Sequence, residues 1–94
     1  MSDLRYSKTP GLRTRAVEAA GSLIVFTPQT PKVHWLNLAG WYLYELSDDA
    51  GEAQIAAEYA DAVAGQVPRE EALAQARDCL AELVDRGILT TTGD

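Results

Sequence analysis

The chain has 94 residues, of which 47% are hydrophobic and 23% are charged, and its formal net charge is −6. This length suits one domain with one modest core, and this balance excludes an intrinsically disordered chain. No apolar run approaches the roughly 20 residues that a membrane-spanning helix needs, and the first residues lack the layout of a secretion signal. We therefore expect a single cytoplasmic domain over residues 1–94, with its core between about residues 10 and 89.

The charge is unevenly distributed along the chain. Residues 1–37 carry five basic and two acidic side chains, whereas residues 38–94 carry three basic and twelve acidic ones. An acidic helical half repels phosphate backbones, so nucleic acid is not expected as a partner, and neither is a membrane. The basic N-terminal half would instead attract an acidic peptide.

The first part of the chain has the pattern of a small antiparallel sheet. Residues 12–17 alternate apolar and basic side chains, residues 23–26 form the strongest β-type run, and Lys32–Leu36 form a third short run. Residues 27–31 contain two prolines and are expected to be a loop. We predict three strands joined by short connections, with Lys32–Leu36 at one edge of the sheet.

The rest of the chain has helical patterns. Asn37 is a suitable N-cap for a helix from residue 38 to about residue 47. A second helix is expected from about residue 52 to residue 64. Pro68 suits the first turn of a third helix, and Gly87 suits its end.

The short segments around these helices complete the expected layout. Residues 47–51 are expected to form a polar turn, and Ile88 and Leu89 to pack back on the core before a polar tail. Strands that precede helices, rather than alternate with them, indicate an α+β fold. The predicted layout, a three-stranded antiparallel sheet followed by three helices, is related to the winged helix.

Few residues suit catalysis or metal binding. His34 is the single histidine and Cys79 the single cysteine, and no CxxC or HxxxH spacing is present. There is no glycine-rich phosphate loop and no nucleophile elbow. The carboxylates of Asp48, Asp49 and Glu52 fit a solvated turn before a helix better than a reactive site. We expect no enzyme activity, no metal and no cofactor.

The expected edge strand is the first candidate for recognition. Its unpaired N–H and C=O groups can accept an extended peptide as a further strand. Strand alternation places His34 and Leu36 on one face and Val33 and Trp35 on the other. With Leu36 facing the core, Trp35 is exposed beside the edge and can anchor a partner. The same pattern also fits Trp35 as a cover over a neighbouring strand.

The third helix is the second candidate. Leu80 belongs to its inward stripe, and Arg77, Ala81 and Val84 lie beside that stripe, which makes it wider than one sheet contact requires. The small side chain of Ala81 leaves room for a ligand, so the edge strand and this helix can form an apolar groove with Arg77 at its rim. The extra width fits a contact with the first two helices equally well.

Three segments together resemble the PqqD family, whose domains are also called RiPP recognition elements (RiPPs are ribosomally synthesised and post-translationally modified peptides). The segments are Trp35-Leu36-Asn37 before a helix, Ile55-Ala56-x-x-Tyr59, and Leu80-Ala81-x-Leu83-x-x-x-Gly87-Ile88-Leu89. The resemblance extends over residues 10–89. It implies a non-catalytic adaptor that binds the leader peptide of a ribosomally made precursor.

In that case the leader peptide would add as a strand beside the third strand and lie against the third helix. The implied binding residues are Lys32, Val33, His34, Trp35 and Leu36 on the strand, with Arg77, Leu80, Ala81 and Val84 on the helix. Arg77 would then contribute to binding an acidic leader. Family members work beside radical SAM enzymes, cyclodehydratases or a separate leader peptidase, so such an enzyme is the second expected partner.

Two other interpretations stay open from the residues alone. The first is a winged-helix transcriptional regulator that binds DNA or a protein. The second is a structural subunit that dimerises through the same edge strand.

Overall fold

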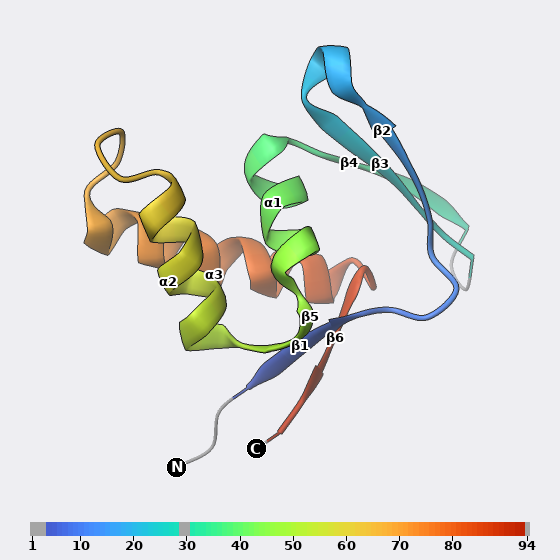
Figure 1. The fold of residues 1–94 in the computed structure, drawn as a ribbon. Coiled ribbons are helices and arrows are strands. Elements are labelled where there is room, and N and C mark those ends of the chain that lie inside the picture. Colours follow the sequence, from blue (N-terminus) through green and yellow to red (C-terminus); the bar gives the residue numbers. More distant parts are fainter. Residues whose placement is uncertain (1–3, 29–30, 94) are drawn as a thin grey trace.

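The computed structural model describes residues 4–28 and 31–93 (Figure 1). In chain order the elements are strands β1 (Arg5–Lys8) and β2 (Arg13–Val17), the short 3-10 helix η1 (Glu18–Ala20), strands β3 (Ser22–Thr27) and β4 (Lys32–Leu36), helix α1 (Leu38–Leu46), strand β5 (Asp48–Gly51), helices α2 (Glu52–Ala62) and α3 (Arg69–Asp85), and strand β6 (Leu89–Thr92). The three predicted strands and three predicted helices are all present, which confirms the α+β class. The loop expected at residues 27–31 lies partly outside the described residues.

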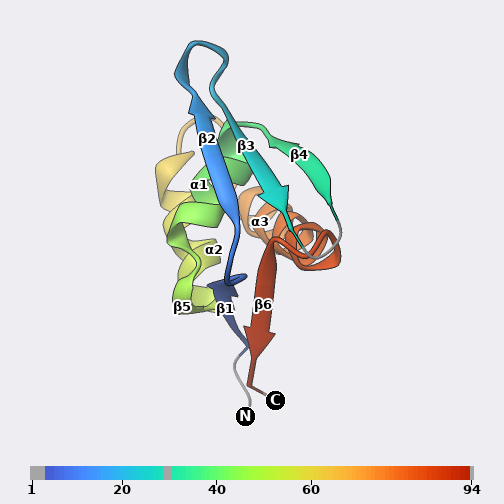
Figure 2. The same cartoon turned by 90° about the vertical axis from the view of Figure 1, so that its right-hand side faces the viewer.

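The predicted sheet is antiparallel with the order β2-β3-β4. Its register places Ile24 opposite Trp35 and Phe26 opposite Val33. In Figure 2 these three strands lie side by side, with β4 as the outer strand on the same side of the molecule as α3. The β2–β3 hairpin extends beyond the helices (Figure 1). This hairpin gives the domain its wing.

A second antiparallel sheet, of order β5-β1-β6, was not predicted. The expectation of a polar turn at residues 47–51 is wrong, because Asp48–Gly51 forms β5 and pairs with β1. On its other side β1 pairs with β6, with Arg5 opposite Thr92. Tyr6 of β1 is buried, and its hydroxyl donates a hydrogen bond to Glu52 Oε1 at 3.1 Å. This sheet therefore ties both ends of the described chain to the start of α2.

The ends of the helices follow the predicted signals. The N–H of Gly40 donates to the side-chain oxygen of Asn37 at 2.8 Å, which confirms Asn37 as the N-cap of α1. After α3, Gly87 adopts a φ of +78°, a left-handed conformation that a side chain disfavours. Ile88 and Leu89 then return to the interior, where both are buried as predicted.

One hydrophobic core joins the helices to both sheets. Its largest fully buried hydrophobic side chains are Val25, Leu43, Ile55, Leu80, Leu83, Ile88 and Leu89. The molecule measures 37 × 35 × 16 Å, so it is flat. At one edge of the β2-β3-β4 sheet, β4 pairs with no further strand among the described residues. Within the described residues, no helix has the length and apolar character to cross a membrane.

Candidate functional site

The outer flank of β4 is unpaired. Within residues 4–28 and 31–93, β4 pairs with β3 on one side and with no strand on the other (Figure 2). This observation confirms the predicted edge strand. A free edge presents backbone N–H and C=O groups that can form hydrogen bonds with an incoming chain.

The side chains of β4 alternate as predicted. Leu36 is buried and His34 is half-buried, whereas Val33 is 59% exposed and Trp35 is 58% exposed. Trp35 lies opposite Ile24 of β3, so it does cover part of its neighbour. More than half of its surface nevertheless stays in contact with solvent. Trp35 is therefore both a neighbour of Ile24 on β3 and an exposed side chain beside the free edge, and its role as an anchor stays a prediction.

Three hollows lie one after another along α3. The first two lie between α3 and β4, and the third lies between α3 and the start of α1. The first, of about 340 Å³, lies at the loop end of β4; the second, of about 180 Å³, lies beside the end of β4; the third, of about 460 Å³, lies between α1 and α3. Arg86 lines both the first and the second, and Asn37, Cys79 and Glu82 line both the second and the third. Because neighbouring hollows share these lining residues, we call the three together the β4–α3 groove, with a loop end and an α1 end.

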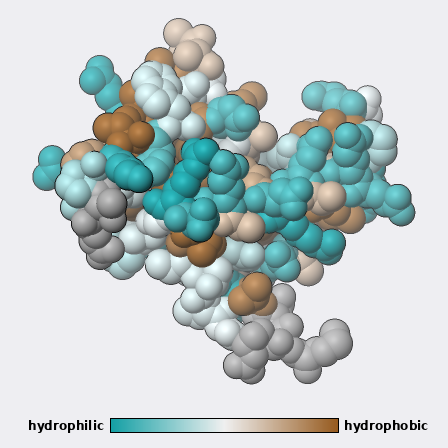
Figure 3. Space-filling view, turned by 180° about the vertical axis from the view of Figure 1, so that it is seen from behind, coloured by the Kyte–Doolittle hydropathy of each residue, from teal (hydrophilic) through white to brown (hydrophobic). Residues whose placement is uncertain are grey.

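Figure 3 shows the molecule from behind, the side on which β4 and α3 lie. Teal polar side chains cover much of this face, with brown apolar atoms exposed among them. The groove lining has the same mixed character. The α3 residues that line it are Gln75, Asp78, Cys79, Glu82, Leu83, Asp85 and Arg86.

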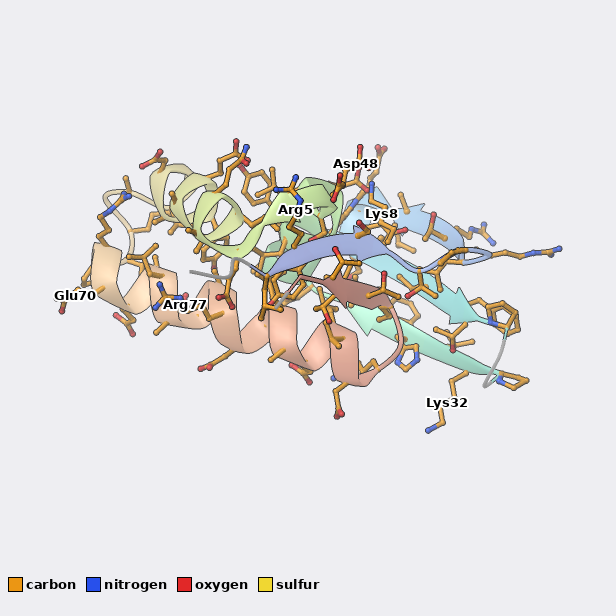
Figure 4. All side chains as sticks on the ribbon, turned by 90° about the horizontal axis from the view of Figure 1, so that it is seen from below. Arg5, Lys8, Lys32, Asp48, Glu70 and Arg77 are labelled. Atoms are coloured by element: carbon orange, nitrogen blue, oxygen red, sulfur yellow. The ribbon has the colours of Figure 1, made fainter. Side chains whose placement is uncertain are left out.

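The helix residues predicted for the site lie elsewhere on α3. Leu80 is completely buried in the core. With about 3.6 residues per turn, Arg77 and Val84 fall on the side of α3 opposite Cys79, and Ala81 also falls outside the groove lining. Figure 4 shows Arg77 on the helical half of the molecule, far along α3 from Lys32. The structure therefore places these four helix residues outside the lining of the groove.

These residues lie outside the groove because of the position of the apolar stripe on α3. An apolar stripe marks the side of a helix that faces the core, whereas the groove runs along the polar flank of that stripe. The missed positions do carry a signal, because Gln75, Asp78 or Cys79, Glu82 and Arg86 recur at helical spacing. The sequence does not reveal which of the two polar flanks faces β4.

Two groove residues have shifted pKa values. The pKa of His34 is lowered, first by burial and then by the positive charges of Arg86 and Lys32. Its Nε2 atom is buried and has no hydrogen-bond partner within the described residues. The pKa of the Cys79 thiol is raised, first by burial and then by Glu82. A raised pKa lowers the fraction of the nucleophilic thiolate form at Cys79.

A winged-helix-type α+β domain with an open strand edge beside a groove is the class of protein that this fold and site define. The sequence model of the family of coenzyme PQQ synthesis protein D (PqqD) matches residues 22–89, and the chain belongs to this family. The matched segment runs from the start of β3 to the start of β6, so it contains every element of the groove. The predicted family resemblance is confirmed.

Among solved structures, the chain is similar to TbiB1, whose structure was determined in complex with the TbiA(beta) leader peptide. The TM-score is 0.70 at 17% sequence identity, and the alignment covers 88% of this chain and 93% of the TbiB1 chain. At this level of identity the similarity establishes the shared fold. A comparison with curated proteins gave no match.

Proposed function

We propose that this chain is a peptide-binding adaptor, which takes up the leader segment of a ribosomally synthesised precursor and presents it to a separate modifying enzyme. The leader adds as a further strand to the free flank of β4 and lies in the β4–α3 groove. Membership of the PqqD family and the fold shared with TbiB1, which was solved with a leader peptide, support this proposal.

The observation that carries the proposal is the free edge of β4 beside the hollows along α3. A strand that joins an open edge gains backbone hydrogen bonds whatever its sequence, while pockets for alternate side chains supply selectivity. We assign the backbone of Lys32–Leu36 to the first role. The middle hollow, which is lined by Trp35, Cys79 and Leu83, would supply a pocket that gives selectivity.

Presentation to an enzyme agrees with the open side of the groove. A peptide strand in the groove would have β4 on one flank and α3 beside it, and the side of the peptide that faces out of the groove would stay accessible. Val33 and Trp35 continue the exposed face of the sheet next to that peptide. A radical SAM enzyme, a cyclodehydratase or a leader peptidase would meet the peptide there.

The charge on α3 argues against the alternative of a DNA-binding regulator. Helix α3 carries five acidic and two basic side chains, and its groove side includes Asp78, Glu82 and Asp85. A recognition helix needs a surface that attracts phosphates and reads base edges. We therefore propose a peptide, and not nucleic acid, as the ligand.

The test is a titration of the isotope-labelled chain with the leader of a precursor encoded beside its gene. We expect the amide signals of Val33–Leu36 and of the groove side of α3 around Cys79 and Glu82 to shift together and to saturate. A neighbourhood without a precursor gene, or a saturating leader that shifts only other signals, contradicts the proposal. Arg77 serves as an internal reference, because its side of α3 lies outside the groove.

A further inference from the structure

The β4–α3 groove differs in charge between its two ends. The charged residues that line the loop end are Lys32, Arg86 and Asp85, which give a formal charge of +1. Those that line the α1 end are Asp78 and Glu82, which give −2, and no basic side chain among the described residues lines that hollow. Glu82 and Arg86 also line the middle hollow, where they pair with each other. The two ends therefore differ in the charges outside this pair, which are Lys32 and Asp85 at the loop end and Asp78 at the α1 end.

The pKa values of two groove residues, His34 and Cys79, are shifted by nearby charges as well as by burial. At the loop end, burial lowers the pKa of His34, and the positive charges of Arg86 and Lys32 lower it further. Farther along the groove, burial raises the pKa of Cys79, and Glu82 raises it further while Arg86 has the opposite, smaller effect.

Part of the charge at each end is free to pair with a ligand: Lys32 and Asp85 at the loop end and Asp78 at the α1 end take part in no ion pair among the described residues. Arg86 forms an ion pair with Glu82, with 2.5 Å between Arg86 Nη2 and Glu82 Oε1. Figure 4 shows Lys32 extending from the loop end of β4 into the open.

We propose that this groove selects a peptide by the order of its charges: a basic side chain at the α1 end and an acidic side chain at the loop end. The inference rests on the proposed function, because the occupant is the leader strand. Ala39, Leu43 and Tyr59 line the α1 end together with the carboxylates, so the apolar stem of a Lys or Arg side chain has a surface to lie on.

The proposal also fixes the direction of the charge order. The β2-β3-β4 sheet is antiparallel throughout, and antiparallel addition is the more stable pairing. Because β4 runs from Lys32 at the loop end to Leu36 at the α1 end, an antiparallel peptide begins at the α1 end. The basic residue therefore precedes the acidic residue in the peptide sequence.

The experiment uses a displayed library of random 15-residue peptides as the probe, selected on the full chain and on a charge-swapped variant. The variant combines Lys32→Glu with Asp78→Lys, which leaves the net charge at −6. A matched control combines Arg77→Glu with Glu70→Lys; this swap has the same size and lies on a face of α3 that does not line the groove (Figure 4).

We expect peptides selected on the native chain to place a basic residue before an acidic one at a fixed spacing. At low salt they should bind the charge-swapped variant about tenfold more weakly, and the difference should shrink to about twofold at high salt, because partly exposed charges are screened. The charge-swapped variant should select the reverse order. The control should bind within about twofold of the native chain.

Two outcomes separate this inference from the proposed function. Peptides that perturb the β4 amides but show no charge order, or that bind the charge-swapped variant equally well, overturn the inference and leave the adaptor function standing. A library from which no peptide perturbs the β4 amides counts against both.

Discussion

Replacing Trp35 with alanine should reduce the affinity for the leader peptide by at least about 30-fold, which corresponds to about 2 kcal/mol. Trp35 is 58% exposed on the strand that would receive the peptide, and it lines the middle hollow of the groove. A large aromatic side chain at the centre of a binding site contributes more than its neighbours, because it buries much surface at little entropic cost. Calorimetry or fluorescence anisotropy with the leader measures the loss.

The matched control for this change is Leu38→Ala. Leu38 is 68% exposed at the start of α1, only three positions after Trp35, but it lines none of the three groove hollows. We expect this variant to bind as the native chain does. If Trp35→Ala kept its affinity within about threefold, Trp35 would not be an anchor of the site.

Replacing Leu80 with alanine should lower the free energy of unfolding by about 3 kcal/mol or more. Leu80 has no exposed surface and lies in the hydrophobic core. Truncation removes buried apolar contacts and leaves a cavity that the neighbouring side chains fill only in part. A domain of this size has a total stability of about 5–14 kcal/mol, so the loss is a large fraction of the whole.

Urea unfolding followed by circular dichroism measures this effect. Leu38→Ala again provides the control, since an exposed side chain should contribute less than about 0.5 kcal/mol. A loss below about 1 kcal/mol for Leu80→Ala would mean that position 80 does not face the core. The experiment thus tests the folding role of Leu80, whereas the family resemblance implied a binding role for it.

Much of the fold was predictable because its signals are local. The strand run at residues 23–26, the Asn37 cap and Gly87 after α3 each depend on a few neighbouring residues. Capping and hydrophobic periodicity are read within one or two turns of a helix. These segments form the groove's framework.

The second sheet was not predictable for the opposite reason. β1 and β6 come from opposite ends of the chain, and each contributes one buried residue, Tyr6 and Leu89 respectively. Strands this short and polar lack the alternation that identifies a half-buried strand. Their stability comes from pairing partners that a local pattern does not reveal.

The candidate site was half predictable. Side chains alternate between the two faces of a strand, so once Leu36 is expected to face the core, Trp35 must face outward, and the structure shows both. Arg77 and Val84 on α3 do not line the groove, and the sequence could not show this, because both flanks of an amphipathic helix look alike in sequence. Only the fold decides that the flank with Cys79 and Glu82 faces β4.

The central claim is that the free flank of β4 receives the backbone of the leader peptide. Amide hydrogen exchange, measured on the chain alone and on the chain saturated with its leader, tests it most directly. We predict that alternate amides within Val33–Leu36 slow at least about tenfold, because each gains a hydrogen bond to the incoming strand, while the amides of β2 are unchanged. Unchanged exchange along β4, with new protection only in β2 or β6, would contradict the account.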